Sequence, residues 1–113
     1  MAPGKAKEMN VLPVDVEVPH TPGSLMQSAY LDTVGRWRIA RKNAELYSVQ
    51  ITSAGAWAQL IVANGQGRTL FHMPSTFTGS FWLGAGADDG IVVTLVSQTM
   101  APIVTVNFRE LRK

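Results

Sequence analysis

Residues 57–73, which read WAQLIVANGQGRTLFHM, decide the fold. Two runs that favour strands flank residues 64–67, a segment rich in turn-forming residues, so the stretch predicts a β-hairpin. A turn that extends through Gly67 places Leu60 opposite Phe71. We prefer this register because directly opposed residues share a face of the sheet, and this register sorts apolar from polar side chains.

The predicted register gives the hairpin two different faces. The face expected in the core consists of Ala58, Leu60, Val62, Thr69, Phe71 and Met73. The other face mixes polar with apolar side chains and consists of Trp57, Gln59, Ile61, Leu70 and His72. This second face is either a second buried layer of the same domain or a surface that meets another chain, since contiguous exposed apolar area usually marks an interface.

The remainder of the chain also has the pattern of strands. Alternating or continuously apolar segments bounded by turn residues occur near residues 12–18, 35–40, 47–52, 77–83, 91–96 and 103–108. Together with the hairpin they predict an all-β fold, an eight-stranded antiparallel β-sandwich of the jelly-roll type with an extended N-terminal arm. Phe81 and Trp82 are expected on opposite faces of their strand, and residues 91–96 in a central strand that is covered on both sides.

The domain organisation is predicted as an N-terminal tail and arm with one edge strand, residues 1–34, followed by the β-sandwich domain, residues 35–113. In the arm, Leu12, Val14, Val16 and Val18 alternate with polar residues and Pro13. Because proline has no N–H to donate to a sheet, this strand is expected at an edge. It is either the first strand of its own domain or an extension that adds to the sheet of a neighbouring subunit.

Ser24 and Gln27 have the spacing of a capping box. This spacing favours a short helix or turn through Tyr30.

The composition limits the function. Charged residues make up 16% of the 113 residues, and the net charge of +2 is too small to indicate nucleic acid by itself. The absence of cysteine excludes disulfides and thiolate metal sites. The start lacks the apolar core of a signal peptide, and no apolar run approaches the roughly 20 residues of a membrane helix, so no membrane partner is expected.

Four basic residues, Arg36, Arg38, Arg41 and Lys42, form the one marked charge cluster of the sequence. Arginines often contact the phosphate backbone of nucleic acids, but one cluster is a small footprint. A solvent-exposed strand face and turn, or pairing between subunits with Asp15, Glu17 and Asp32, is favoured, and a nucleic-acid partner is not expected.

Catalytic and metal-binding motifs are lacking. Neither His20 nor His72 has a second ligand at metal spacing, and residues 78–81 lack the second glycine of a nucleophile elbow. The glycine-rich residues 84–90 are predicted to be a loop, whose two aspartates are a small ligand set for Ca²⁺. We expect no catalysis, no cofactor and no metal.

Three stretches are of a kind seen in phage structural proteins: LPVDVEV at 12–18, GRTLFHMPSTF at 67–77 and APIVTVNFRE at 101–110. With these stretches and its size, the chain resembles the small jelly-roll decoration (cement) proteins of tailed-phage capsids. The resemblance covers residues 35–110 and the arm. It implies a non-enzymatic virion protein on the capsid surface, made in the host cytoplasm, whose partners are copies of itself, as a dimer or trimer, and the major capsid protein.

The residues expected at partner interfaces are Leu12, Val14, Val16 and Val18 of the arm, Arg36 and Arg38, Trp57, Ile61, Leu70 and His72 of the hairpin, and Trp82. Two other functions stay open. One is a carbohydrate- or receptor-binding module of a phage tail or fibre, in which Trp82 or Trp57 stacks on sugar rings and residues 84–90 shape the site. The other is a nucleic-acid-binding protein that uses residues 36–42.

Overall fold

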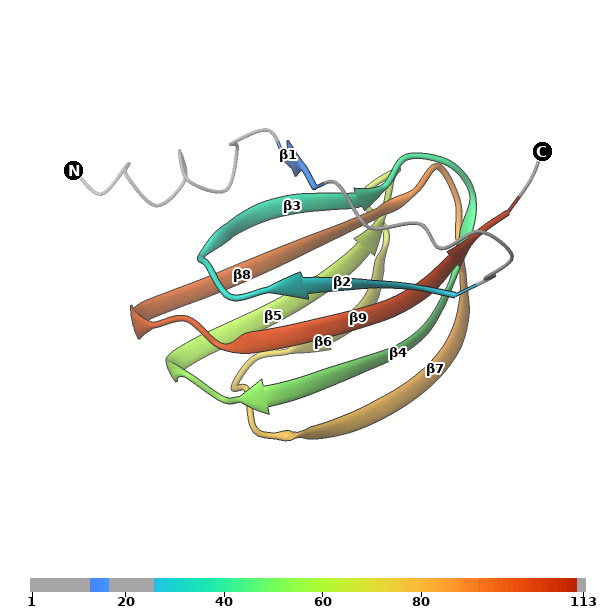
Figure 1. Ribbon diagram of the computed structural model, residues 1–113. Helices are drawn as coiled ribbons and strands as arrows, with labels where there is room; N and C mark the ends of the chain where they lie inside the picture. Colours follow the sequence, from blue (N-terminus) through green and yellow to red (C-terminus); the bar gives the residue numbers. More distant parts are fainter. Residues whose placement is uncertain (1–12, 17–25, 112–113) are drawn as a thin grey trace.

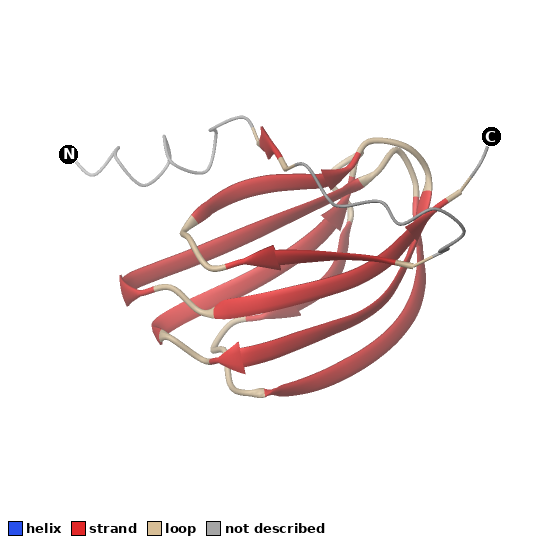
Figure 2. Cartoon of the chain, in the orientation of Figure 1, coloured by secondary structure: helices blue, strands red, loops and turns tan. Residues whose placement is uncertain are grey.

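Two β-sheets pack face to face in the computed structural model, which describes residues 13–16 and 26–111 (Figure 1). Within these ranges the chain consists of strands joined by short loops, without a helix (Figure 2). The five-stranded sheet has the order β1-β3-β8-β5-β6, and the four-stranded sheet has the order β2-β9-β4-β7.

The described residues form nine strands. These are β1 (Val14–Asp15), β2 (Gln27–Leu31), β3 (Gly35–Ala40), β4 (Ala44–Ser53), β5 (Ala56–Asn64), β6 (Thr69–Met73), β7 (Gly79–Ala87), β8 (Ile91–Met100) and β9 (Ile103–Glu110). The predicted all-β sandwich is confirmed, but the number of strands is nine instead of eight.

The two differences from the predicted sandwich concern β1 and β2. The pairing of β1 with β3 is parallel, so the five-stranded sheet is mixed and not antiparallel throughout. The short helix expected near Tyr30 is wrong, since β2 forms an edge of the four-stranded sheet although it lies within the segment predicted as tail and arm. Ala29 and Leu31 are buried, while Ser28 and Tyr30 are exposed. This alternation outweighs the capping signal, because burial against β9 stabilises a strand here.

The hairpin forms, but its register differs from the prediction by two residues. Leu60 pairs with Met73 and Val62 with Phe71. Because side chains alternate with a period of two, a shift of two keeps each of these residues on its predicted face. The inward face of β5 is therefore as predicted although the pairing is not.

The turn chemistry explains the shift. The side-chain oxygen of Asn64 accepts hydrogen bonds from the N–H groups of Gln66 and Arg68, both at 2.9 Å. The Asn64 N–H also donates to the carbonyl of Arg68 at 2.9 Å, which closes a loop of three residues instead of four. A bulge then follows beside Ala63, so that Leu70 packs against the core and Thr69 is exposed, the reverse of the prediction.

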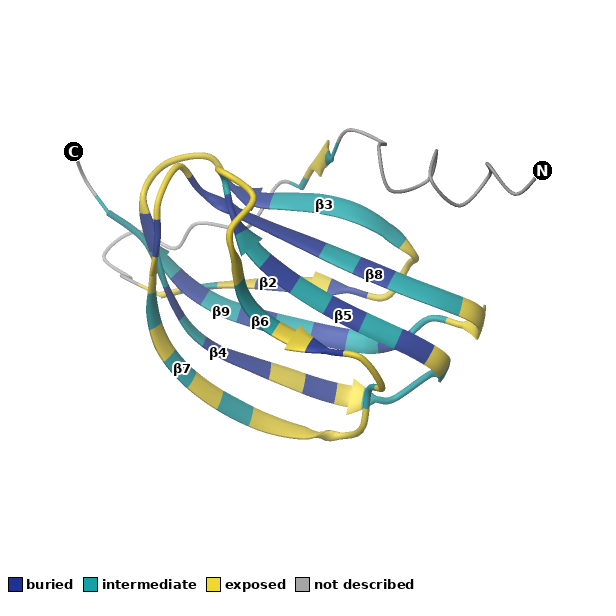
Figure 3. Ribbon diagram, turned by 180° about the vertical axis from the view of Figure 1, so that it is seen from behind, coloured by how far each residue is buried: buried dark blue, intermediate teal, exposed yellow. Residues whose placement is uncertain are grey.

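The core lies between the sheets and follows strand alternation. Buried and half-buried residues alternate along β5 from Ala58 to Asn64 and along β8 from Val93 to Val96 (Figure 3). Val104, Val106 and Phe108 of β9 face inward and are fully buried, as predicted. Residues 91–96 lie in β8, between β3 and β5, which confirms their central position. The expected cover on both sides is wrong, since among the described residues no further layer lies over the outer face of β8, where Thr94 and Val96 are half-buried. The opposite orientations of Phe81 and Trp82 are also confirmed, since Phe81 packs against the core and Trp82 is exposed.

The connections between strands gather at two ends of the sandwich (Figure 1). The connections β2–β3, β4–β5, β6–β7 and β8–β9 lie at one end, on the left in Figure 1. The connections β3–β4, β5–β6 and β7–β8 lie at the other end.

The second end is tied together through its backbone. The N–H of Gly65 donates to the carbonyl of Asp88 at 2.9 Å, and the N–H of Asp89 donates to the side chain of Asn43 at 2.8 Å. There is no space for a side chain at Gly65, because an added Cβ would lie 1.9 Å from the carbonyl oxygen of Asp89. This close approach fixes the β5–β6 turn against the β7–β8 turn.

Gly65→Ala is expected to lower the free energy of unfolding by about 1–3 kcal/mol, because the methyl group forces two backbones apart. The matched control is Gly86→Ala, where an added Cβ meets no atom within 4 Å. Its effect should stay below about 1 kcal/mol in either direction. Urea denaturation measures both values, and equal losses from the two variants would contradict the close approach at Gly65.

Candidate interaction surfaces

The arm residues that the structure describes lie at an edge of the five-stranded sheet. β1 pairs with β3 of the same chain, and the N–H of Val16 donates to the carbonyl of Arg38 at 3.0 Å. Val16 packs against the core, whereas Val14 is exposed. The edge position predicted from Pro13 is confirmed. Leu12 and Val18 lie outside the described residues, and the contact of the arm with a partner stays a prediction.

Asp15 of the arm partly neutralises the basic cluster. Its carboxylate lies 3.5 Å from Nε of Arg38 and also contacts the guanidinium of Arg41. The cluster thus pairs with Asp15 within the same chain, whereas the sequence favours pairing between subunits, which stays a prediction. All three side chains are partly exposed, so each pair contributes at most about 1 kcal/mol to stability.

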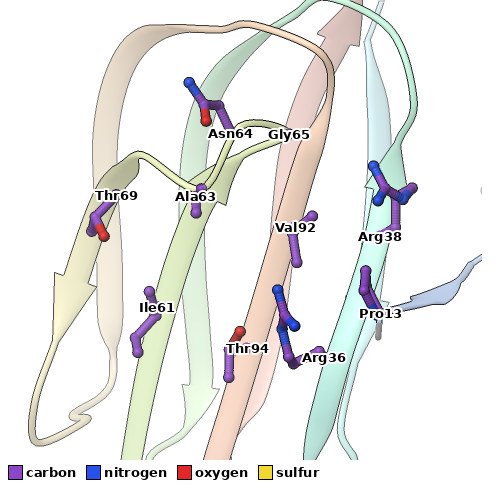
Figure 4. A pocket seen from close by; sticks show the side chains of 11 residues that line it. Pro13, Arg36, Arg38, Ile61, Ala63, Asn64, Gly65, Thr69, Val92 and Thr94 are labelled. Atoms are coloured by element: carbon purple, nitrogen blue, oxygen red, sulfur yellow. The ribbon is translucent and has the colours of Figure 1, made fainter. Parts of the chain in front are cut away.

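Arg36 and Arg38 line a cavity of about 290 Å³ on the outer face of the five-stranded sheet (Figure 4). Pro13 of the arm lies on the Arg38 side of the cavity, while Ile61 and Thr94 come from the strands across the sheet (Figure 4). Among the described residues no third layer covers this face. The second face of the hairpin is therefore not the buried layer that was one of its two interpretations.

The outward residues of the hairpin do not form one patch. Ile61 lies in the cavity, and Nε2 of His72 lies 2.8 Å from Nε2 of Gln59. Leu70 turns toward the core through the bulge in the hairpin. Trp57 lies apart from them, at the end of the sandwich. The structure thus keeps Gln59, Ile61 and His72 together on the outer face, where Ile61 pairs with His72. It separates Trp57 and Leu70 from them.

Large apolar side chains surround the end of the sandwich where four connections meet. Trp57 is 81% exposed, Met100 59%, Phe77 56% and Val34 47%. We call these four residues the apolar rim. Asp32 is the one charged residue in the four connections at this end. The connections at the opposite end carry the charged residues Arg41, Lys42, Arg68, Asp88 and Asp89.

Trp57 has an unusual backbone. Its φ angle is 53°, and it lies at a bulge between Ala56 and Ala58 where β5 pairs with β8. A left-handed conformation costs a residue with a side chain roughly 1–2 kcal/mol. The exposed indole buries little area in return, so it contributes little to folding.

Hydrogen bonds from Ser97 and Thr76 hold the backbone around Trp57. The hydroxyl of Ser97 lies 2.9 Å from the carbonyl oxygen of Ala56 and 2.6 Å from that of Met100. The N–H of Thr76 donates to the carbonyl of Ala58 at 3.1 Å. These contacts join the three segments that carry Trp57, Met100 and Phe77, three of the four residues of the apolar rim.

Sequence reasoning found Trp57 but missed Val34, Phe77 and Met100. Val34 and Phe77 lie in connections, and Met100 ends a strand. No spacing in the sequence relates them, because only the winding of strands between the two sheets brings these segments to one end.

Trp82 lies on a different surface, the outer face of the four-stranded sheet, and is exposed. The loop expected at residues 84–90 is wrong in its extent. β7 continues to Ala87, so the turn contains Asp88, Asp89 and Gly90 alone, at the charged end of the sandwich. The parts expected to form a carbohydrate site therefore lie at three separate places, namely Trp57, Trp82 and this turn.

In the described ranges, no three side chains from histidine, aspartate and glutamate gather closely enough to hold a metal ion. The part of the chain that the structure describes contains no helix of the length and apolarity needed to cross a membrane. The sequence matches no known family model, and no curated protein is similar to it.

Asp15→Asn removes the charge that Arg38 and Arg41 contact. The free energy of unfolding should fall by less than about 1 kcal/mol, because the ion pairs are partly exposed. Detachment of β1 should become easier, so thermolysin should cleave near Val14 and Val16 roughly two- to fivefold faster.

The control for this experiment is Asp32→Asn, since Asp32 is acidic and exposed but is not the carboxylate that pairs with Arg38 and Arg41. Unchanged cleavage of Asp15→Asn, with the same rate as the control, would show that Asp15 does not hold the arm.

Proposed function

We propose that this chain is a non-enzymatic structural protein that binds neighbouring subunits of a larger assembly. More specifically, we propose a capsid decoration protein of a tailed phage, located on the capsid surface and bound to the major capsid protein and to copies of itself. The observation that carries the proposal is the apolar rim, whose four large side chains are each exposed at one end of the sandwich while the connections there are almost uncharged. Exposed apolar area of this kind is typical of protein contact surfaces.

The order of the strands supports the jelly-roll part of the proposal. Without β1, the strands counted along the chain follow the order first-eighth-third-sixth in one sheet and second-seventh-fourth-fifth in the other. This order is the one expected when eight strands are wound as two Greek keys. Viral capsid domains are among the proteins built in this way.

The arm supports a role in assembly. It adds a short parallel strand to the sheet edge, held by two hydrogen-bonded residues and by partly exposed ion pairs. Such a strand is weakly held, and the same hydrogen-bonding groups can pair with the sheet edge of a neighbouring copy.

The nucleic-acid alternative has less support. Two of the four basic residues of the cluster, Arg38 and Arg41, contact one carboxylate of the same chain. Asp15 therefore already neutralises part of the positive charge of these two arginines, which leaves less of it for contact with phosphate groups.

Trp57→Gly tests the contact with the shell. Glycine accepts the left-handed backbone, so the free energy of unfolding should stay within about 1 kcal/mol of the original or rise. Loss of a central tryptophan from an interface costs about 2 kcal/mol or more, so the affinity for the shell should fall roughly 30-fold. The measurement is co-sedimentation with heads of the phage that encodes the chain, assembled without it.

Trp82→Ala is the matched control, because it removes an equally exposed tryptophan from another surface. It should bind the heads like the original chain. The proposal fails if the original chain does not sediment with the heads, or if Trp57→Gly binds as tightly as Trp82→Ala does.

Self-association is tested separately by light scattering of the purified chain. We expect the mass of a dimer or trimer that persists on dilution, because a subunit-bridging protein makes contacts with its own copies. A monomer mass at every concentration would remove self-association from the proposal.

A further inference from the structure

The outer face of the four-stranded sheet carries two exposed aromatic rings at its opposite edges. Tyr30 lies on β2 and is 61% exposed, and Trp82 lies on β7 and is 77% exposed. β2 and β7 are the two edge strands of this sheet (Figure 1). Three spacings between strands separate them, a distance of about 14 Å. The two rings thus span more than one sugar ring would cover.

Small uncharged polar side chains fill the area between the rings. The strand register places Thr105, Gln50 and Ser80 in one row with Tyr30, and Ser28, Asn107 and Ser48 in the next row with Trp82. Neither row contains a charged or an aliphatic side chain. Ser48 is buried, so the accessible part of this face consists of the hydroxyl and amide groups of the other five residues, between two aromatic rings, and is neutral.

One row of this face is ordered by its own hydrogen bonds. The hydroxyl of Ser28 donates to Oδ1 of Asn107 at 2.5 Å, and Nδ2 of Asn107 donates to the hydroxyl oxygen of Ser48 at 2.9 Å. The amide of Asn107 is thereby oriented before any ligand binds. In the other row, the side chains of Gln50 and Ser80 are exposed and make no hydrogen bond within the described part of the chain.

The charges next to these rows compensate one another. Arg109 lies 2.7 Å from Glu45, and the hydroxyl of Tyr47 donates to Glu45 at 3.1 Å. Burial and this hydrogen bond raise the pKa of Tyr47, while Arg109 opposes the shift. The phenol therefore stays protonated at neutral pH, and the neighbourhood of the face does not favour an ion of either sign.

We propose that this face binds a neutral oligosaccharide. Trp82 and Tyr30 stack on the C–H faces of sugar rings, and the amides and hydroxyls between them, above all Gln50 and Ser80, bond to sugar hydroxyls. A sugar chain presents both kinds of surface, apolar ring faces and polar edges, whereas the centre of a protein interface is depleted in serine and a lipid surface needs an apolar face.

The site is separate from the proposed contact with the shell. The apolar rim lies at the end of the sandwich, and Trp82 lies on the side of it. Failure of one proposal therefore leaves the other standing, and the two exposed tryptophans provide reciprocal controls.

The experiment is affinity electrophoresis of the full chain in gels that contain soluble neutral polysaccharides, one each of glucan, galactan, mannan and xylan type. At least one of them should retard the chain. Trp82→Ala and Tyr30→Ala should each weaken that binding about tenfold, because each removes one stacking contact. Trp57→Gly should bind the polysaccharide like the original chain. Both alanine variants remove exposed side chains, and their free energies of unfolding, measured in urea, show that they fold.

Three outcomes would overturn the proposal. The first is that none of the neutral polysaccharides retards the chain. The second is retardation by heparin alone that disappears at high salt, which would point to Arg36 and its neighbours. The third is that Trp82→Ala or Tyr30→Ala changes the mass in light scattering while polysaccharide binding is the same as in the original chain, which would make this face a contact between copies.

Discussion

The burial of two sheets against one another is the constraint on which the rest of the structure depends. Once Val104, Val106 and Phe108 of β9 are fixed in the core, Thr105 and Asn107 must face solvent, because successive residues of a strand point to opposite sides. The same rule turns Trp82 outward when Phe81 packs inward. The chemistry of the outer faces is therefore set by the residues that alternate with the core residues along each strand. A ligand of an outer face would contact these residues.

The two ends of the sandwich meet different requirements. At the charged end, Gly65 and Gly90 let backbones approach so closely that a Cβ would lie about 2 Å from a carbonyl oxygen, 1.9 Å at Gly65 and 2.1 Å at Gly90. The polar groups there largely satisfy one another. At the other end, the hydroxyls of Ser97 and Thr76 satisfy backbone carbonyls, and the large side chains of the apolar rim remain uncovered. The turns at one end thus pack against one another, whereas the other end leaves large apolar side chains exposed.

Strand alternation made the fold class and the inward faces predictable from the sequence. Residues such as Leu60 and Val62 lie on their predicted side although the register of the hairpin is displaced by two. What pattern reasoning could not find are the bulges, since one additional residue reverses the face of everything near it. Leu70 was assigned to the outer face for this reason, and a bulge beside Trp57 places that residue outside the patch predicted for it.

Of the two candidate surfaces, the apolar rim and the outer face of the four-stranded sheet, the sequence identified only single tryptophans. Trp57 and Trp82 stood out because an exposed tryptophan is rare and a strand has only two faces. Tyr30 was assigned to a helix or turn, so its place at the edge of a sheet, opposite Trp82, could not be foreseen. Val34, Phe77 and Met100 are related by topology alone, because they come from three separate connections or strand ends.

The two proposed contacts depend on different kinds of interaction, and one molecule can make both at the same time. The apolar rim offers large side chains without charge, so its contribution to binding is largely the non-directional removal of apolar area from water. The sheet face offers amide and hydroxyl groups, whose hydrogen bonds to a ligand are directional. The strands run between the two ends, and a sheet face points across them, so a partner seated on the rim leaves the sheet face accessible (Figure 1). A decoration protein attached by its rim would therefore present Tyr30 and Trp82 sideways, where a sugar chain can reach both rings.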